Sequence, residues 1–477
     1  MTFRLYTPPR VIEERGQNYF IAPHPEPREE PPGLLDIILG ARYSLLGNWT
    51  RDMYRSGVDS FPVLRRNIVF ANTPESIKYV MVTRHDNFER KSPQMRRALE
   101  VLLGDGLFIS EGQTWKTRRP LVADIVHKNR VPAFGRTMEE TTVSFAQGWQ
   151  NLARQGTEFE LTAAMAELTA EIISRTVFGH NLGAEAARRV IDGFSSYQRH
   201  IDSFNLPYFL GADEGWPILH GPAKRRAVKM VHGVVEDVVN AHLAGGGEEG
   251  SMIDLMVKRR TRNPELKLDV AALRNEAATI FMAGHETTAT TLTWAFYLIA
   301  NAPWVEKTIV DEIAAACGDR TPTINDLDAL PWCKAVINET LRLYPPVPLL
   351  PRQARGEDTV GDIPIRKGDL VMIAPWLIQR AEDLWDKPTH FMPERFMGDV
   401  RINPFAYIPF AVGPRLCAGL NFGLSESILC FAILMQRFRV RPRAGYVAEP
   451  VCRLTLRPAG GLPCTLIERT RVEAEAA

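Results

Sequence analysis

The segment from Pro409 to Leu420 reads PFAVGPRLCAGL and places a single cysteine, Cys417, among residues that shape the backbone. Gly413 and Gly419 permit tight or left-handed turns, and Phe410 can shield a sulfur atom from water. A helical pattern begins at about Gly419, and a helix N-terminus stabilises a thiolate. A lone cysteine is most often an inert core residue. The segment alone therefore leaves two interpretations open, a buried structural thiol and a thiolate that binds a metal.

The composition of the chain is that of a globular protein. It has 477 residues, of which 45% are hydrophobic and 24% are charged. The formal net charge of +1 offers no electrostatic basis for nucleic-acid binding by the protein as a whole. The six cysteines form no CxxC pair, which disfavours zinc ribbons and thioredoxin-like redox motifs, and their density is not that of a small secreted disulfide scaffold. The cysteine usage therefore predicts a reducing, cytoplasmic setting.

The N-terminal region has no apolar core of signal-peptide type, and we expect no transmembrane anchor. Its most apolar stretch, GLLDIILGARYSLLGNW at residues 33–49, is interrupted by Asp36 and Arg42. It falls well short of the roughly 20 apolar residues that a spanning helix needs. We expect an amphipathic helix there, either packed on the body of the protein or lying on a membrane surface.

Secondary-structure signals predict a mainly helical fold with small β-sheets. β-branched and aromatic residues indicate a strand and turn at residues 61–73, and helical patterns dominate from about residue 75 to 344. The longest helix begins near Asp269, a suitable N-cap, and continues to Pro303. At 1.5 Å per residue it spans roughly 50 Å. Its apolar residues occupy most faces, so we expect it to be buried at the centre.

Short strands and loops dominate after residue 344. We expect a hairpin at residues 360–376 that turns at Lys367–Gly368, a helix at about residues 419–437, and a final strand pair within residues 453–469. The predicted organisation is an N-terminal extension with a first helix, residues 1–58, followed by one large domain over residues 59–477.

The segment AGHETT, residues 283–288, lies in the middle of the long helix. Gly284 costs roughly 1 kcal/mol relative to alanine in a helix interior, and buried polar side chains beside it need partners. One interpretation is a locally satisfied kink, since a threonine hydroxyl can bond to the carbonyl four residues earlier. The other is a helix opened to admit a ligand or water, in which Glu286 and Thr287 handle protons.

Two further motifs pair an arginine with a neighbour on one helix face. In ETLR, Glu339 and Arg342 are three residues apart and can pair, although most such pairs are surface salt bridges of little worth. Because PERF follows with Arg395 and no helical pattern, the three residues could form a network that locks an irregular region. In WKTRR, Trp115 and Arg119 suit carboxylate or phosphate recognition, or form a cation–π pair.

Together these motifs resemble those of the cytochromes P-450, the haem-thiolate monooxygenases. FAVGPRLCAG matches the haem-binding pattern FxxGxRxCxG of that family. WKTRR, AGHETT, ETLR and PERF match its WxxxR, (A/G)Gx(D/E)T(T/S), ExxR and PERF patterns, in the family's order. The likeness covers about residues 60 to 467. It implies the cytochrome P-450 fold, a single large domain with the long central helix over a haem.

The resemblance implies a role for each motif residue. Cys417 would be the axial thiolate of haem b (iron protoporphyrin IX), which favours O–O cleavage. Glu286 and Thr287 would be the catalytic acid–alcohol pair that relays protons. The other cofactor-binding residues would be Trp115, Arg119, Arg352 and Arg415 at the propionates, Phe410, Gly413 and Gly419 in the cysteine loop, and Ala283 and Gly284 on the distal side. Glu339, Arg342 and Arg395 would form a structural network behind the cysteine.

The implied function is insertion of one oxygen atom from O2 into an apolar organic substrate, by hydroxylation or epoxidation. Electrons would come from a separate ferredoxin-type donor with its NAD(P)H-dependent reductase, because no reductase domain is recognisable in the chain. We expect a soluble, bacterial-type enzyme that is cytoplasmic and monomeric. The alternative is a non-enzymatic haem sensor or carrier, which needs neither the acid–alcohol pair nor a large apolar pocket.

The resemblance also places two surfaces. The substrate pocket would be lined by residues 95–108, residues 204–210, the region of Ala283 and residues 347–350. The proximal face would dock an acidic partner, because opposite charges steer encounter. Its basic residues would be Lys116, Arg118, Lys128, Arg130 and Arg415. One departure from the family pattern is Gln379, where histidine is common, and we expect it to change local hydrogen bonding only.

Overall fold

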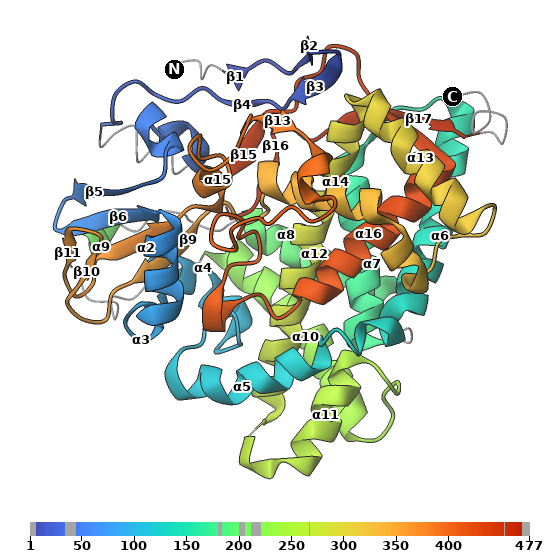
Figure 1. Ribbon diagram of the computed structural model, residues 1–477. Helices are drawn as coiled ribbons and strands as arrows, with labels where there is room; N and C mark the ends of the chain where they lie inside the picture. Colours follow the sequence, from blue (N-terminus) through green and yellow to red (C-terminus); the bar gives the residue numbers. More distant parts are fainter. Residues whose placement is uncertain are drawn as a thin grey trace.

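The computed structural model describes residues 6–33, 44–179, 184–199, 206–210, 221–266, 268–452 and 454–469. Helices make up most of these residues, and the largest sheet lies at one side of the helical part (Figure 1). The predicted fold class, mainly α with small β-sheets, is confirmed.

The helices and strands have the following bounds. The helices are α2 (Pro74–Lys78), α3 (His85–Phe88), α4 (Pro93–Leu103), α5 (Gly112–Ile125), α6 (Val131–Gln155), α7 (Leu161–Phe178), α8 (Ala184–Arg199), α9 (Leu206–Phe209), α10 (Pro222–Leu243), α11 (Met252–Arg262), α12 (Val270–Ala300), α13 (Pro303–Cys317), α14 (Pro331–Leu343), α15 (Pro375–Ile378) and α16 (Leu420–Arg437). The strands are β1 (Tyr6–Thr7), β2 (Arg10–Glu14), β3 (Gln17–Ile21), β4 (His24–Pro25), β5 (Gly57–Val63), β6 (Arg66–Asn72), β7 (Arg90–Lys91), β8 (Phe159–Glu160), β9 (Leu350–Gln353), β10 (Asp358–Val360), β11 (Ile363–Ile365), β12 (Leu370–Ile373), β13 (His390–Phe391), β14 (Phe438–Pro442), β15 (Pro450–Cys452), β16 (Leu456–Pro458) and β17 (Pro463–Glu468).

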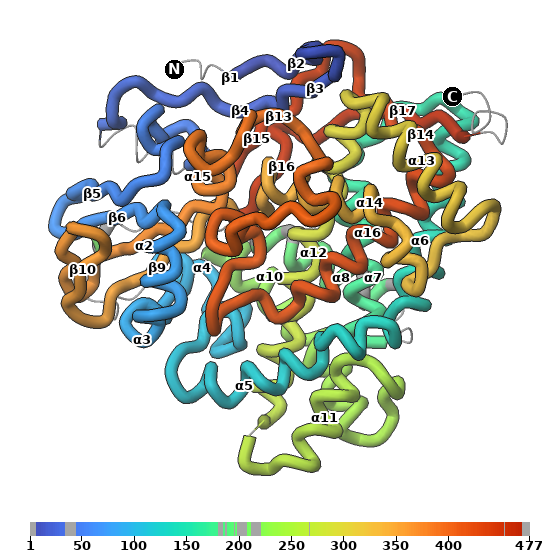
Figure 2. Tube along the Cα trace, in the orientation of Figure 1, coloured from blue at the N-terminus to red at the C-terminus, as the bar shows by residue number. Residues whose placement is uncertain are grey.

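The long helix α12 passes through the middle of the molecule (Figures 1 and 2). The Asp269 carboxylate accepts the Ala272 N–H at 2.7 Å and so caps its first turn. Its side chains are buried on most faces, and it packs against α7, α10 and α14. A Cβ atom at Gly284 would lie 2.8 Å from the Ile173 side chain of α7. The glycine therefore allows α7 and α12 to approach closely.

The five-stranded sheet has the order β5-β6-β12-β9-β7, with β6 and β12 parallel. The strand and turn predicted at residues 61–73 correspond to the end of β5, a turn and the whole of β6. The hairpin predicted at residues 360–376 is wrong in its pairing, because β10 pairs with β11 around Gly361 and β12 pairs with β6 and β9. The cause is Asp369, which accepts the N–H groups of Arg366 (2.8 Å) and Asn67 (3.1 Å). These bonds direct β12 to the start of β6.

The last strands also pair differently from the prediction. Strand β16 pairs with β15, and β17 pairs with β14 and β8, so the two strands within residues 453–469 do not pair with each other. The Leu462 N–H donates to the Glu160 carboxylate (2.6 Å), and the Leu161 N–H donates to the Leu462 carbonyl (2.9 Å). These bonds draw the chain between β16 and β17 to the start of α7.

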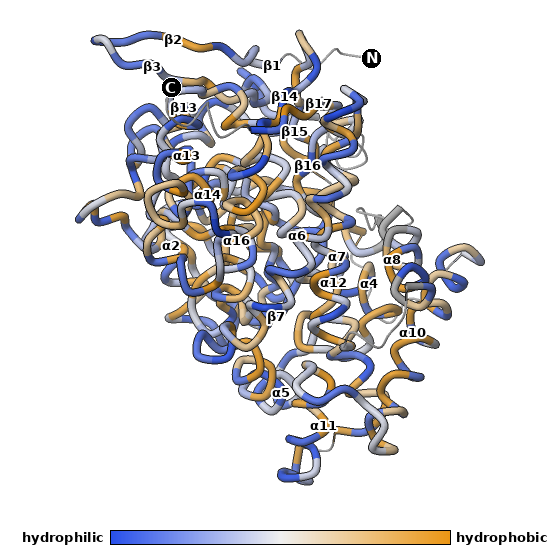
Figure 3. Tube along the Cα trace, turned by 90° about the vertical axis from the view of Figure 1, so that its right-hand side faces the viewer, coloured by the Kyte–Doolittle hydropathy of each residue, from blue (hydrophilic) through white to orange (hydrophobic). Residues whose placement is uncertain are grey.

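The N-terminal strands pack on the body of the protein, with the β2–β3 hairpin at its edge (Figure 3). Strand β3 pairs with β13, and the Tyr344 hydroxyl donates to the Pro23 carbonyl (2.8 Å). The boundary predicted at residue 58 falls within β5. Residues 34–43 of the predicted amphipathic helix lie outside the described residues, and a 3-10 helix covers Leu45–Asn48. Of the helices that the structure describes, none combines the length and hydropathy needed to cross a bilayer.

A buried ionic network fixes the irregular chain that precedes the cysteine loop. The guanidinium of Arg342, near the end of α14, donates twice to the Glu339 carboxylate, at 2.6 Å each. It also donates to three backbone carbonyls, those of Gln379 (2.9 Å), Pro388 (2.7 Å) and His390 (2.9 Å). Arg395 Nε lies 3.5 Å from the same carboxylate. The side chain of Arg342 on α14 thus fixes the backbone of a loop region at three separate carbonyl groups.

Gln379 is buried, and its side chain is bonded entirely to backbone groups. Its amide nitrogen donates to the carbonyls of Leu341 (2.9 Å) and Arg342 (3.0 Å), and its oxygen accepts the Ile408 N–H (2.9 Å). The glutamine therefore adds a further link between α14 and the chain before Cys417.

A second buried cluster ties the loop after α4 to α12 and α5. The fully buried Glu276 carboxylate accepts the Leu107 N–H (3.1 Å) and the Arg118 guanidinium (3.2 Å). Arg118 also donates to both carboxylate oxygens of Asp105, at 2.7 Å each. The prediction that Arg118 belongs to a docking face is wrong, because its charge is paired inside the protein. Burial raises the pKa of Glu276 to about 7.

Replacing Arg342 by alanine should destabilise the protein strongly, because it leaves the buried Glu339 carboxylate with only Arg395 at 3.5 Å and the Met392 N–H at 3.0 Å as partners. Loss of one partner of a buried ion pair costs about 3–5 kcal/mol. Urea denaturation, followed by circular dichroism, measures the free energy of unfolding. As a control, Arg136→Ala removes an exposed partner of Glu140 and should change the unfolding curve little. Equal curves for the two variants would contradict the structural role of Arg342.

The pKa of Glu276 predicts a pH-dependent stability. Since its pKa is raised from 4.5 to about 7 in the folded protein, the native state holds a proton that the unfolded chain has lost between these values. Stability should therefore fall as the pH rises through this window. Glu276→Gln removes this titration, so the variant should gain about 3 kcal/mol relative to the parent between pH 4.5 and 7.5. Parallel pH profiles of unfolding free energy would contradict the prediction.

Candidate functional site

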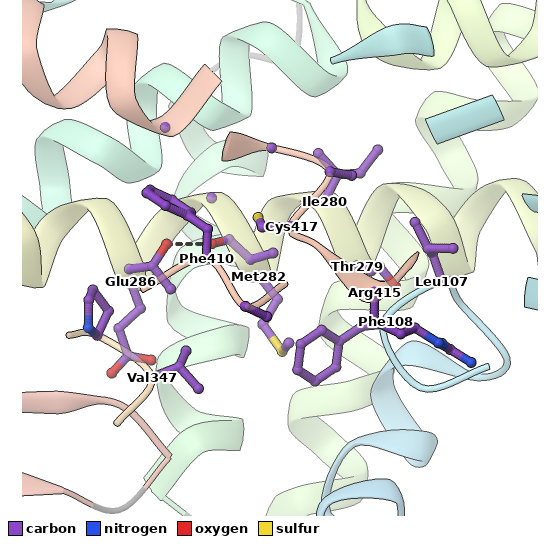
Figure 4. Close-up of a pocket in the computed structure, with 18 of the residues that line it drawn as sticks. Leu107, Phe108, Thr279, Ile280, Met282, Glu286, Val347, Phe410, Arg415 and Cys417 are labelled. Carbon is purple, nitrogen blue, oxygen red and sulfur yellow. Dashed lines mark hydrogen bonds between the residues drawn. The ribbon is translucent and has the colours of Figure 1, made fainter. Parts of the chain in front are cut away.

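One cavity brings most of the sequence-predicted residues together. It lies between α12, α5, the loop before α16 and the chain around β9 and β16, and it leaves about 300 Å³ in which the centre of a water molecule can move. The predicted residues that line it are Trp115, Arg119, Ala283, Gly284, Glu286, Thr287, Arg352, Phe410, Arg415, Cys417 and Gly419. Gly413, Glu339, Arg342 and Arg395 lie outside the lining. Figure 4 shows Phe410, Arg415 and Cys417 from the loop facing Ile280, Met282 and Glu286 from α12.

The cysteine loop is shaped by backbone bonds and one obligatory glycine. Gly413 has φ +73°, and a Cβ atom there would lie 2.3 Å from the Met81 carbonyl oxygen. The Cys417 N–H donates to the Phe410 carbonyl at 2.9 Å and closes the turn. Gly419 has φ −84°, and a Cβ atom there would meet only the Cys417 sulfur, at 4.0 Å. The predicted backbone role therefore holds for Gly413, whereas Gly419 leaves space beside the sulfur.

Cys417 differs from the other cysteines of the chain. All six cysteines are unpaired, and five of them are buried. The buried ones are Cys317, Cys333, Cys430, Cys452 and Cys464. Cys430 lies in the helix packing, with its sulfur 3.2 Å from the Thr142 hydroxyl, and does not line the cavity. Only Cys417 exposes its sulfur to the cavity. Surrounding protein raises the pKa of its thiol by burial, while the Gly419 N–H and nearby cations lower it.

Four basic side chains gather at the cavity: Lys91, Arg119, Arg352 and Arg415. Burial lowers the pKa of all four, that of Lys91 far below its usual value and that of Arg352 to about 10. Of these four, Arg415 alone has a carboxylate partner among the described residues, Glu89 at 3.2 Å. A buried cation without a counter-charge is unfavourable. The cluster therefore fits a ligand that brings negative charge.

The bonds of Arg415 show where such a ligand can bind. Nη1 donates to the Ser110 carbonyl (2.8 Å), Nη2 pairs with Glu89, and the guanidinium lies 4.2 Å from the Trp115 ring centroid. The buried Nε has no hydrogen-bond partner in the protein. His85 Nε2, next to the same tryptophan ring, is also buried without a hydrogen-bond partner in the protein. The two propionate carboxylates of a haem would fit this donor set, next to the Cys417 sulfur.

The structure also decides between the two interpretations of WKTRR. The cation over the Trp115 ring is Arg415, so the alternative of a Trp115–Arg119 cation–π pair is not observed. Both motif residues line the cavity. Arg119 is half-buried, and its binding of a ligand stays a prediction.

Glu286 and Thr287 line the cavity from α12, which continues unbroken through residues 283–288. The Thr287 hydroxyl donates to the Ala283 carbonyl (2.7 Å), so the locally satisfied helix is observed and the opened helix is not. Glu286 Oε1 accepts a bond from the Thr455 hydroxyl (2.5 Å). The carboxylate is thus held by another part of the chain, and the hydroxyl by its own helix.

The predicted substrate-lining segments are found only in part. Residues 95–108 and 347–350 supply Met95, Leu99, Leu107, Phe108, Val347 and Leu350. Tyr208 and Phe209 instead pack against Val63 and Leu370 of the large sheet, and the Tyr208 hydroxyl donates to the Gly368 carbonyl. This part of the prediction is wrong because the sheet offers these aromatic side chains a buried surface. Residues 204–205 of that segment lie outside the described residues.

Sequence patterns missed Lys91 and Thr455. Lys91 lies opposite Arg352 because β7 pairs with β9, and its ammonium lies 3.3 Å from the Phe108 ring centroid. Thr455 reaches Glu286 because β15 and β16 pack near α12. Neither residue belongs to a spaced motif, and each enters the site only through contacts between distant parts of the chain.

The sequence of the chain is similar to a known protein family and to several characterised relatives. A protein-family model described as Cytochrome P450 matches residues 52–461. A cytokinin hydroxylase of Arabidopsis thaliana is 30% identical over 408 residues, which are 82% of this chain and 77% of that protein. A cyclooctat-9-en-7-ol 5-monooxygenase of Streptomyces melanosporofaciens is 27% identical and covers 72% of this chain and 74% of its own.

Solved structures support the fold. The crystal structure of the cytochrome P450DA heme domain superposes with a TM-score of 0.75 at 22% identity, over 88% of this chain and 90% of that one. A likeness at this identity concerns the arrangement of the elements rather than the substrate. The fold predicted from the five motifs, with a long central helix in one helical body, is confirmed.

Proposed function

Because the chain belongs to the cytochrome P450 family of monooxygenases, we propose that it inserts one oxygen atom from O2 into an apolar organic substrate, by hydroxylation or epoxidation. The observation that carries this proposal is a single cavity lined by Cys417, a cluster of cations and the Glu286–Thr287 pair. The balanced reaction converts substrate, O2, two electrons and two protons into the oxygenated product and water.

The family binds haem through a cysteine thiolate, and we infer that Cys417 supplies it here. Exposure to the cavity and the Gly419 N–H support this assignment over the buried Cys430. Lys91, Arg119, Arg352 and Arg415, together with Trp115, would hold the two propionates of haem b. Lys91, Arg119 and Arg352 have no carboxylate partner among the described residues, which supports this role.

The haem, when bound, supplies the redox chemistry that activates oxygen, and a thiolate ligand favours O–O cleavage. The chain's own residues handle protons and shape the space. The Glu286 carboxyl carries a proton at the cavity wall, and the Thr287 hydroxyl passes it on by turning away from the Ala283 carbonyl. Ala283 carries only a methyl group, so it leaves this part of the wall open to O2 and substrate, while Gly284 lines the same wall and lets α12 pack closely on Ile173.

Apolar side chains dominate the rest of the lining, which supports a lipid-like, terpenoid, steroid or aromatic substrate. They include Leu99, Leu107, Phe108, Ile280, Met282 and Leu454. A haem sensor or carrier needs neither this surface nor a carboxyl–hydroxyl pair. The relatives that are named hydroxylases and monooxygenases likewise favour the enzyme over that alternative.

We propose a separate, acidic ferredoxin-type donor with its NAD(P)H-dependent reductase. Lys116, Lys128 and Arg130 are exposed, on α5 and the turn that follows it, and support docking by charge complementarity. The side chains of Arg118 and Arg415 are buried, so the proposed face is smaller than the sequence suggested. Unpaired cysteines support a reducing compartment such as the cytoplasm of a bacterial-type cell. We further propose a monomer in which residues 59–477 form the haem domain and residues 1–58 an extension.

The spectrum of the reduced, CO-bound protein tests the haem ligand. The parent should show the Soret band near the wavelength in the family's name, which reports thiolate ligation. Cys417→Ala should lose this band, because no other cysteine sulfur of the described residues is exposed to the cavity. Cys430→Ala is the matched control and should keep it. Retention of the band in Cys417→Ala, or its loss in a folded Cys430→Ala, would reject the assignment.

Thr287→Ala tests proton delivery. The probe substrate is whichever of lauric acid, β-ionone, testosterone and naphthalene gives the largest spin-state shift, and a surrogate ferredoxin and reductase supply electrons. The variant should still consume NAD(P)H and O2, but its product yield should fall about tenfold or more as reducing equivalents appear as peroxide. Thr287→Ser should restore coupling. Unchanged product per NAD(P)H in Thr287→Ala would count against the role of the hydroxyl.

A further inference from the structure

The Glu286 carboxylate is held by a residue outside α12. The Thr455 hydroxyl, from the turn between β15 and β16, donates to Glu286 Oε1 at 2.5 Å. Thr455 is largely buried, and both residues line the cavity. The contact joins residues 169 positions apart in the chain.

The turn that carries Thr455 is anchored on its neighbours. The Leu456 N–H donates to the Pro346 carbonyl (3.0 Å), next to the cavity-lining Val347. The indole N–H of Trp294, on α12, donates to the Leu456 carbonyl (3.4 Å). On the other strand, the Cys452 N–H donates to the Ser44 hydroxyl (3.2 Å). The Thr455 hydroxyl is therefore presented by a fixed element rather than by a freely moving side chain.

Two further observations connect this turn to the cavity. Cys452, at the end of β15, is buried, and burial followed by the charge of Glu286 raises the pKa of its thiol to about 12. Leu454, beside Thr455, lines the same cavity. A molecule that packs against Leu454 thus contacts the element that holds the carboxylate.

We propose that Thr455 is a positioning residue for proton delivery: its hydroxyl fixes the Glu286 carboxyl in the cavity wall beside Thr287. The inference rests on the proposed function, because it assigns Thr455 a part in the same reaction. Thr455 itself gives up no proton to the substrate or to oxygen. It keeps the acid in one orientation while protons pass through Glu286, and removal of its hydroxyl leaves the carboxyl free to turn away.

Thr455→Val removes the hydroxyl and keeps the shape of the side chain. With the probe substrate of the preceding subsection, kcat should fall about tenfold, since a hydrogen bond to a charged group is lost, and the peroxide share should rise. The spectral Kd for the probe should stay unchanged, because the apolar lining is intact. Thr455→Ser should restore kcat. Thr293→Val, on the same helix, removes a buried hydroxyl that donates only to the Ala289 carbonyl (2.8 Å) outside the cavity, and should behave like the parent.

A double-variant cycle separates positioning from packing. Thr455→Val should add nothing to Glu286→Gln, because both act through one group. Three outcomes would each overturn the proposal. The first is a double variant whose loss of kcat is the product of the two single losses. The others are a parent-like kcat in Thr455→Val and a weakened spectral Kd with unchanged kcat. The infrared CO-stretching band of the reduced, CO-bound protein gives a substrate-free readout of polar groups at the cavity, and it should shift in Thr455→Val and return in Thr455→Ser. A parent protein with the thiolate Soret band but no such shift rejects this inference alone, whereas a parent without that band rejects the proposed function.

Discussion

The site depends on the buried guanidinium of Arg342. A guanidinium has five N–H donors, and Arg342 makes five hydrogen bonds, two to Glu339 and three to backbone carbonyls between residues 379 and 390. Those carbonyls belong to a stretch with little regular structure of its own. Since buried carbonyls need donors, one side chain gives this stretch the order that a sheet would otherwise supply. The loop that presents Cys417 lies further along the same part of the chain, after β13 and a 3-10 helix at Pro393–Phe396.

Most of the cations at the cavity differ from Arg342, because they have no carboxylate partner among the described residues. Arg342 and Arg118 are buried and form ion pairs with carboxylates, so the protein itself compensates their charges. Lys91, Arg119 and Arg352 are buried or half-buried at the cavity without such partners among the described residues. Buried charge persists only where something compensates it. The contrast between paired and unpaired cations therefore separates the residues that hold the fold from those that hold a ligand.

Sequence alone predicted the parts of this protein whose chemistry is local. The Asp269 cap, the long buried helix, the Glu339–Arg342 pair and the turn at Gly413 each depend on residues close together in the chain. Contacts between distant segments were not predictable in the same way. The pairing of β12 depends on Asp369 reaching Asn67, and the burial of Arg118 depends on a glutamate 158 positions away. A pattern of residue types carries no signal for either contact.

The Glu286–Thr287 pair shows how local and distant contacts divide one function. The Thr287 hydroxyl bonds to a carbonyl of its own helix, a contact that any threonine in a helix can make. Its position is therefore set by sequence neighbours. The Glu286 carboxylate has a longer, more flexible side chain and takes its partner from a turn far along the chain. A motif can specify that an acid stands beside an alcohol, but the direction in which the acid points is a property of the folded protein.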